Sequence, residues 1–455
     1  MSTYYDLIES KKHKGAASGF DPVYMPEMAF EYQKYGIEKA VKTGRFANLY
    51  DTGLGKTLIQ LAIAQNIVQH TNGRVLIMTP LAVAFQFLKM AEQMGIDDVE
   101  YSKDGKFKKK IVICNYERLH YFNSGDFMGA MVDESSILKN HEGQTRAMIT
   151  QFMKNVKYRQ LSTATPSPND YTELGTSSEA LGYMGYADML TKFFKNDQNS
   201  VDSRRSDGDY YLKAHAEKDF WAWLSTFSIC VRRPSDIGFS DDGYQLPELH
   251  QNLHVIRNET PLVINGQGSL FALPAVNFFE TKAEGKATIT RRCEQAFELA
   301  QPHEISVHWV NLDQEAECLR SLSSDNVEIN GKMSIDKKEE ILMAFADGQI
   351  KKLITKPTIT GFGLNWQHCG HTTYFPTYSY EQFYQALRRF YRFGRIGDVI
   401  ADVVISDGQE RMYKKMIAKK EKADRMYTEM VNSVNSIYKH QSKEFSKPII
   451  KPSFF

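Results

Sequence analysis

The chain has 455 residues, 42% of them hydrophobic and 24% charged, a composition typical of a globular protein rather than a disordered or fibrous one. Its 56 Lys and Arg residues nearly balance 55 Asp and Glu residues, so the net charge of +1 provides no general attraction for nucleic acid. The five scattered cysteines form no C-x-x-C pair, which argues against a disulfide framework or a zinc cluster. The N-terminal sequence lacks an apolar signal core, and no apolar stretch has the length of a membrane span, so we expect a soluble cytoplasmic protein with no membrane partner.

Short strand-like runs alternate with helical patterns in two parts of the chain. In the first part the runs are 46–50, 74–79, 110–114, 130–133 and 159–163, with helical patterns at 56–70 and 80–94. In the second part they are 305–310, 326–330, 351–355, 372–375 and 401–406, with helical patterns near 312–322, 334–347 and 379–392. Such alternation predicts βαβ units and parallel sheets. We therefore predict an α/β protein with two domains, residues 1–250 and 251–455.

Three segments have a different pattern. Residues 171–232 are predicted to be mostly helical, between the core motifs. Residues 258–285 carry Gly and Pro and little periodicity, as an insertion would. Residues 409–439 form a lysine-rich pattern that predicts a C-terminal helical tail.

The sequence "YDTGLGKTLIQLAIA" places Gly53, Gly55, Lys56 and Thr57 between a predicted strand and a predicted helix. Glycines allow backbone N–H groups to turn around phosphate oxygens, the lysine can reach the β- and γ-phosphates, and the threonine can hold Mg²⁺. Tyr50 stands where the strict phosphate-loop pattern has glycine. The alternative is an ordinary glycine-rich turn beside a lysine.

Asp133 and Glu134 follow the apolar strand at 130–133. In a nucleotide hydrolase the strand-end Asp orients Mg²⁺ through its waters, and the neighbouring Glu polarises the attacking water. Alone, the pair would be interpreted as a solvated turn. Together with the phosphate loop it predicts a magnesium site made by Thr57 and Asp133, with Glu134 as the catalytic base.

Two further patterns point to coupling and to charge neutralisation. In "LSTATPSPND" the hydroxyls of Ser162, Thr163 and Thr165 are expected near the acidic pair, although a Ser/Thr/Pro turn is the simpler interpretation. In "YEQFYQALRRFYRFGR" the four- and three-residue spacing of Gln385, Arg389 and Arg392 predicts one helical face. Such arginines can neutralise charge on a transferred phosphoryl group. The alternative is a solvated basic face.

In this order, the motifs resemble those of a superfamily-two helicase, and more closely a Swi/Snf-like motor of the compact kind encoded by bacteriophages. Other matching segments are "FEYQKYGIEKAV", "VLIMTPLAV", "ICNYERL", "DESSILKN", "VRRPSDIG" and "TKPTITGFGLNWQHC". The resemblance implies two tandem RecA-like domains that bind ATP and Mg²⁺ and step along nucleic acid.

The resemblance also assigns roles to residues that carry no signal of their own. It places Gln33 near the adenine and Gly363 in a glycine-rich nucleotide motif. It implies DNA contacts at four residues: Thr79, Lys139, Thr360 and Asn365. Ser136 stands where many relatives have histidine, so coupling of ATP to DNA is expected to run through its hydroxyl, with Gln385 as a further coupling residue.

The sequence therefore predicts an ATP-dependent DNA helicase or translocase that remodels forks and junctions in phage-type replication, recombination or repair. Its expected partners are DNA and replication or recombination proteins in a bacterial host cytoplasm, and a monomer is favoured. The alternatives are an RNA helicase and a nucleic-acid-binding scaffold without hydrolysis. A small-molecule kinase with a phosphate loop is disfavoured because it has no use for the second domain.

Overall fold

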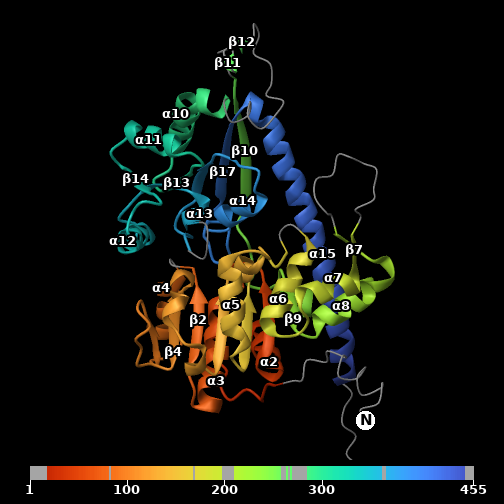
Figure 1. Cartoon of the computed structure of the whole chain (residues 1–455). Helices are drawn as coiled ribbons and strands as arrows, with labels where there is room; N and C mark the ends of the chain where they lie inside the picture. The colour runs from red at the N-terminus through yellow and green to blue at the C-terminus, as the bar shows by residue number, and fades with distance from the viewer. Residues whose placement is uncertain are drawn as a thin grey trace, which may run out of the picture. The chain divides into compact units, whose positions relative to one another are not determined.

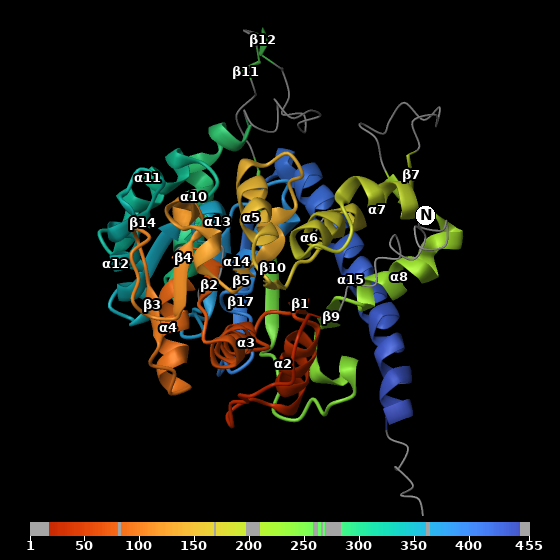
Figure 2. The ribbon, with the colours of Figure 1, turned by 60° about the horizontal axis from the view of Figure 1, so that its bottom comes forward.

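The computed structural model describes residues 18–80, 83–167, 170–196, 210–257, 263–264, 267–268, 284–360 and 365–445, with side chains up to residue 436. The chain divides into two compact units (Figure 1 and Figure 2). The first unit is Met1–Asp242 with Arg425–Phe455, and the second is Gly243–Asp424. The sequence placed the boundary at residue 250 and the whole tail in the second domain, whereas the structure groups the end of the tail with the first unit.

The first unit contains a seven-stranded sheet in the order β3-β4-β2-β5-β6-β1-β9, and every neighbouring pair is parallel. Its strands are β1 (Arg45–Tyr50), β2 (Val75–Thr79), β3 (Val99–Tyr101), β4 (Ile111–Asn115), β5 (Gly129–Asp133), β6 (Tyr158–Ser162) and β9 (Ser228–Val231). The central strands are buried along their whole length because helices cover both faces of such a sheet. Parallel pairing brings the carboxyl ends of all these strands to one edge, where ligands bind in this class of fold.

The helices of the first unit are α2 (Glu31–Thr43), α3 (Lys56–Thr71), α4 (Ala84–Gln93), α5 (Gln144–Lys154), α6 (Leu174–Leu181), α7 (Tyr186–Phe193) and α8 (Glu217–Ser225). Helix α2 packs on α3, α3 packs on α4, and α5 packs on α6. Helix α3 is apolar on most sides, and ten of its residues are buried. It therefore serves as the central helix beside the sheet, and its first residue, Lys56, directly follows the glycine-rich loop.

The segment predicted as helical at 171–232 also contains strands. It holds α6, α7 and α8, but also the hairpin of β7 (Phe194–Asn196) with β8 (Tyr210–Leu212), and β9, which pairs with β1. The prediction missed β9 because its four residues follow α8 closely and are too few to show a strand period.

The second unit contains a six-stranded parallel sheet in the order β10-β17-β16-β13-β15-β14. Its strands are β10 (Leu249–Ile256), β13 (Ser306–Trp309), β14 (Asn326–Ile329), β15 (Lys352–Thr355), β16 (His371–Tyr374) and β17 (Val399–Ser406). Its helices are α10 (Ile289–Ala300), α11 (Asp313–Leu322), α12 (Ile335–Ala346), α13 (Pro357–Thr360), α14 (Tyr380–Leu387) and the start of α15 (Glu410–Phe445). Of the segment 258–285, the short hairpin of β11 (Val263–Ile264) and β12 (Gln267–Gly268) and residues 284–285 are described, and the rest lies outside the described residues.

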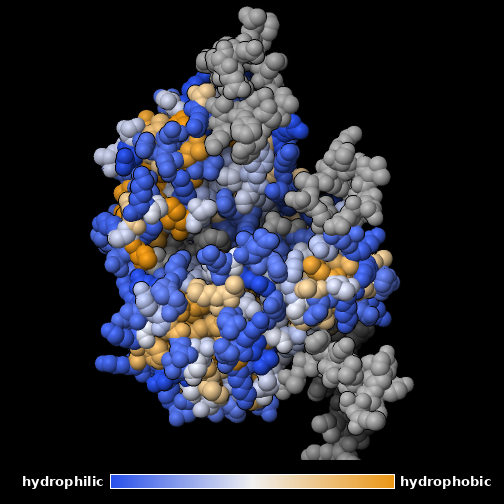
Figure 3. All heavy atoms as spheres, viewed as in Figure 1, coloured by the Kyte–Doolittle hydropathy of each residue, from blue (hydrophilic) through white to orange (hydrophobic). Residues whose placement is uncertain are grey.

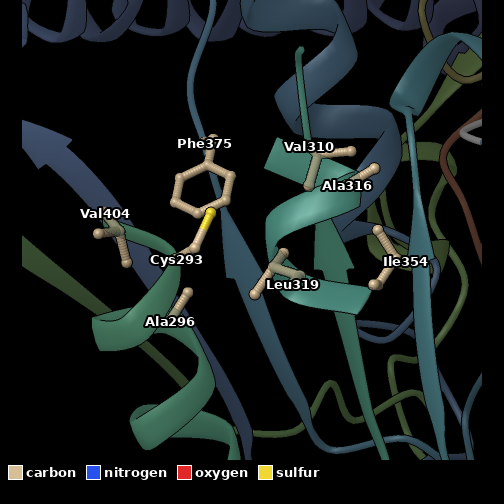
Figure 4. Packing of buried hydrophobic residues seen from close by; sticks show 8 residues of the cluster. All are labelled: Cys293, Ala296, Val310, Ala316, Leu319, Ile354, Phe375 and Val404. Carbon is tan, nitrogen blue, oxygen red and sulfur yellow. The ribbon is translucent and has the colours of Figure 1, made fainter. Parts of the chain in front are cut away.

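A compact apolar cluster joins α10 and α11 to the second sheet (Figure 4). Its members are Cys293, Ala296, Val310, Ala316, Leu319, Ile354, Phe375 and Val404. Figure 4 shows the Cys293 side chain pointing toward the ring of Phe375. Beside the cluster, Arg292 forms a buried ion pair with Glu315, at 2.8 Å, which fixes α10 against the start of α11.

The visible face of the molecule is mostly hydrophilic, with smaller hydrophobic areas between the polar side chains (Figure 3). Within the described part of the chain, no helix combines the length and the apolar character that a membrane span requires.

Candidate nucleotide-binding site

The loop between β1 and α3 has the backbone geometry of a phosphate cradle. Gly53 and Gly55 have φ angles of 86° and 78°, in the left-handed region that favours glycine. A Cβ atom at Gly55 would also lie 2.2 Å from the side-chain nitrogen of Gln33. Both the backbone angle and the lack of space therefore favour glycine at position 55. The 16-residue helix α3 begins at Lys56, so the positive end of its dipole lies at this loop.

Lys56 and Gln33 hold the loop in place. The Lys56 ammonium donates to the carbonyl oxygens of Tyr50, at 3.1 Å, and Asp51, at 3.3 Å. The buried Gln33 amide donates to the carbonyl of Leu54 at 3.0 Å, and its oxygen accepts from the N–H of Phe30. Tyr50, the residue in place of the usual glycine, is buried, and its hydroxyl donates to the carbonyl of Tyr32.

Asp133 and Glu134 lie at the carboxyl end of β5, and both are almost fully buried. The Asp133 carboxylate accepts hydrogen bonds from Gln60 of α3, at 2.8 Å, and from Thr79 at the end of β2, at 3.1 Å. Burial and the neighbouring Glu134 raise the pKa of Asp133, while Gln60, Lys56 and Thr79 act in the opposite direction. The Gln60 bond ties the helix that starts at the phosphate loop directly to the acidic pair.

Glu134 has a strained backbone. Its φ and ψ angles are 50° and 55°, a left-handed conformation that is rare for a residue other than glycine. Such strain is kept mainly at functional sites, where it aims a side chain. The strain here turns the Glu134 carboxylate toward Thr163, whose hydroxyl donates to it at 3.4 Å.

The predicted coupling residues of the first unit lie close to the acidic pair. Ser162 ends β6 and donates to the carbonyl of Asn48 at 3.5 Å, and the Thr163 hydroxyl accepts from the N–H of Thr165. Ser136 is buried in the short 3₁₀ helix η4 (Ser135–Leu138) that follows Glu134. The structure therefore brings the acidic pair and Thr163 into direct contact.

Two residues that hold Asp133 carry no role in the sequence prediction. Gln60 stands four residues after Lys56 on α3, so helical spacing was the signal that could have found it. The hydroxyl of Tyr116 donates to the carbonyl of Asp133, a contact that no sequence pattern indicated. Thr79, predicted as a DNA contact, is buried, and its hydroxyl is directed to Asp133.

In the second unit, the predicted arginine helix is shorter than expected. Helix α14 ends at Leu387, so the prediction of a helix over 379–392 was wrong about its end. Arg389 lies in the turn that follows and is buried; its guanidinium donates to the carbonyl of Gln385, at 2.9 Å, and to the side-chain oxygen of Gln385, at 3.0 Å. Arg392 is half-buried in the next turn.

The remaining predicted residues have different environments. Thr360 is buried and donates to the hydroxyl of Thr355, whereas Asn365 is exposed. Lys139 is half-buried, and burial lowers its pKa. Thr57 lies half-exposed in the first turn of α3, and Gly363 lies outside the described residues.

No protein-family model matches the chain, and no curated protein matches it. Among solved structures, a Dbp5 variant of S. cerevisiae bound to a Gle1 variant and IP6 aligns with a TM-score of 0.51 and 11% identity, over 86% of this chain and 85% of that chain. The chain has a fold of two tandem RecA-like parallel-sheet domains. The SWI2/SNF2 ATPase core of Sulfolobus solfataricus in complex with dsDNA aligns with a TM-score of 0.40 and 16% identity, over 91% and 98% of the two chains.

The donor atoms at this candidate site suit a magnesium ion. Mg²⁺ prefers hard oxygen ligands, which the Thr57 hydroxyl and the Asp133 carboxylate offer. The two side chains that donate to Asp133, Gln60 and Thr79, are neutral. Burial penalises the charge on Asp133, and a divalent cation would compensate that penalty.

Proposed function

We propose that the chain is a nucleic-acid-dependent ATPase that moves along DNA and remodels forks, junctions or duplexes. The observation that carries this proposal is the contact between the phosphate-loop helix and the acidic pair, made by Gln60 and Asp133. This hydrogen bond connects the helix that follows the phosphate loop to the buried carboxylate of Asp133, within one unit. A binding scaffold without hydrolysis would not need the strained Glu134.

Each site residue has a defined task in this mechanism. The backbone of Gly53 and Gly55 and the ammonium of Lys56 bind the β- and γ-phosphates, and Gln33 fixes the loop and contacts the adenine. Thr57 and Asp133 hold Mg²⁺, which neutralises charge on the phosphates. Glu134 accepts the proton of the attacking water.

We also assign tasks to residues of the second unit. Arg389 and Arg392 neutralise charge that develops on the transferred phosphoryl group, and Gly363 completes the nucleotide contact. We assign Gln385 to coupling. It accepts two hydrogen bonds from Arg389, which supports this assignment. In the first unit, Ser136, Ser162, Thr163 and Thr165 relay the state of the nucleotide to the nucleic acid.

Nucleic acid is held mainly through its phosphates, so the motor tolerates any sequence. The proposed contacts are Thr79, Lys139, Thr360 and Asn365, all four assigned by the family resemblance alone. We place the protein in phage-type recombination, replication or repair in a bacterial host cytoplasm, acting as a monomer with DNA and proteins of those pathways.

The test compares ATP turnover by the full chain with single-stranded DNA, duplex DNA, forks, four-way junctions and RNA of equal length. We expect DNA forks or junctions to stimulate turnover at least about tenfold, with Lys56→Ala abolishing it because the phosphate contact is lost. Stimulation by RNA but not DNA would establish the alternative, an RNA helicase. Absence of turnover with every nucleic acid would overturn the proposal.

A further inference from the structure

The end of helix α15 docks on the first unit. From Arg425 onward the helix belongs to that unit, and its residues Met426, Met430, Val431 and Val434 are buried. Met426, Met430 and Val434 are four residues apart, and Val431 precedes Val434 by three, so the buried side chains lie along one face of the helix. The docked segment is therefore an integral part of the nucleotide-binding unit, although it follows the phosphate loop by more than 300 positions in the sequence.

The docked segment reaches the strand ends beside the phosphate loop through polar contacts. The Tyr427 hydroxyl lies 3.0 Å from the carbonyl oxygen of Leu49 on β1 and 3.4 Å from that of Val231 on β9. The guanidinium of Arg232 covers the Tyr427 ring, 4.8 Å from its centroid. About two turns further on, Asn435 donates to the carbonyl of Cys230 at 2.7 Å.

One of these carbonyls, that of Leu49, belongs to the short backbone stretch that holds the catalytic lysine, and the carbonyl of Val231 is bonded to the same stretch. Leu49 immediately precedes Tyr50, whose carbonyl accepts from Lys56, and Asp51, the next acceptor, donates its own N–H to Val231 at 2.8 Å. Tyr427 thus contacts both strands at the point where β1 becomes the phosphate loop. A shift of this peptide would move the two acceptors of the Lys56 ammonium.

We propose that Tyr427 is a positioning residue for the phosphate loop. Its hydroxyl fixes the end of β1 against β9, so that Lys56 and the glycine loop keep the geometry that binds the phosphates of ATP. The inference rests on the proposed function for its role in turnover, but it predicts nucleotide affinity directly. The tail is then a part of the ATP site and more than a surface helix.

A matched pair of variants separates positioning from docking. Tyr427→Phe removes only the hydroxyl and keeps the ring beside Arg232. Tyr171→Phe removes a hydroxyl that bonds the same turn of α15, at 2.8 Å from Glu429 and 3.2 Å from the carbonyl of Met426, and it does not touch β1. Both variants lose one hydroxyl that anchors the tail, and only the first loses the contact with the phosphate-loop strand.

The measurement is the dissociation constant of Mg·ATP by calorimetry, together with the KM for ATP and kcat, on full-length proteins. We expect Tyr427→Phe to raise both Kd and KM about fivefold with kcat nearly unchanged, the effect of one lost hydrogen bond. Tyr171→Phe should match the wild type in Kd and KM. Thermal unfolding midpoints of the two variants should agree within a few degrees.

An unchanged Kd in Tyr427→Phe, or an equal increase in Tyr171→Phe, would overturn the inference, since either result means that the tail only docks. A wild-type protein that binds ATP but never hydrolyses it would instead overturn the proposed function, and the ratio of Kd values would still decide the role of Tyr427.

Discussion

Asp133 shows how much of the proposed catalytic site depends on residues with no motif of their own. Its two oxygens are held by Gln60 and Thr79, and its own carbonyl is held by Tyr116. The sequence identified the carboxylate from its place at the end of an apolar strand. Helical spacing after Lys56 was a signal for Gln60. Thr79 and Tyr116 could not be identified as partners, because they come from other elements that meet β5 only when the sheet forms.

Thr79 has two possible roles, support of Asp133 and contact with DNA, and an experiment can separate them. If its hydroxyl serves Asp133, Thr79→Val should raise the Mg²⁺ concentration that gives half-maximal ATP turnover about threefold to tenfold, because one donor to the carboxylate is lost. Affinity for DNA should not change. The measurement is a magnesium titration of turnover, alongside DNA binding by fluorescence anisotropy.

Thr79→Ser keeps the hydroxyl and serves as the control, which should resemble the wild type. Weaker DNA binding by Thr79→Val with an unchanged magnesium requirement would show instead that Thr79 contacts DNA.

Among the elements, the second sheet contains a histidine whose burial links stability to pH. His308 on β13 is fully buried, and its Nδ1 lies 2.7 Å from the hydroxyl of Thr373 on β16. Burial lowers the pKa of His308 from 6.5 to about 3, and the nearby His371 and Lys352 act in the same direction. The folded state therefore keeps this ring neutral at a pH where the unfolded chain binds a proton.

The sign of the pH effect follows from this difference. The contribution of neutral His308 to the free energy of unfolding is fully present above about pH 6.5. It is lost as the pH falls toward 3, because the unfolded state then binds more protons than the folded state. We expect the denaturant concentration at the unfolding midpoint of the second unit to decrease as the pH is lowered from about 6.5 to about 4. In His308→Asn, which keeps a polar group near Thr373 but cannot take up the proton, the decline should be shallower.

Denaturant unfolding of both proteins across this pH range measures the effect. Parallel declines in the wild type and in His308→Asn would show that other groups account for the acid sensitivity.

Helices and strands were predictable where the hydrophobic pattern of one kind of element continued over enough residues. The buried strands β2 and β5 and the helix α3 follow from apolar runs and from the switch to helical spacing. Strands β1 and β6 contain polar residues and follow from their place in the alternation of strands and helices. Strand β10 was missed because it is an edge strand with several exposed residues, so its sequence resembles a polar connection. The end of α14 was missed because the four-residue spacing of Gln385 and Arg389 is typical of a helix. In the structure Arg389 lies in the turn after the helix and donates to the carbonyl of Gln385 from there.

At the scale of the whole molecule, sequence order indicated two α/β domains but not where the tail belongs. The lysine-rich pattern of α15 predicted a helix, and its length was approximately right. Its docking on the first unit involves buried apolar side chains and the polar side chains of Tyr427 and Asn435. The partners of Tyr427 and Asn435 lie on β1 and β9. Pairings between residues so distant in sequence cannot be derived from local patterns.

The central claim is that Glu134 activates the water that attacks ATP. Its direct test is Glu134→Gln, which keeps the size and hydrogen-bonding ability of the side chain but removes the base. The control is Glu142→Gln, which changes an exposed carboxylate in the loop after η4. The measurement is DNA-stimulated turnover together with the Kd for Mg·ATP.

The account predicts that Glu134→Gln loses turnover by about a hundredfold or more and keeps its affinity for ATP within about twofold, while Glu142→Gln matches the wild type. Turnover by Glu134→Gln at the wild-type rate would contradict it.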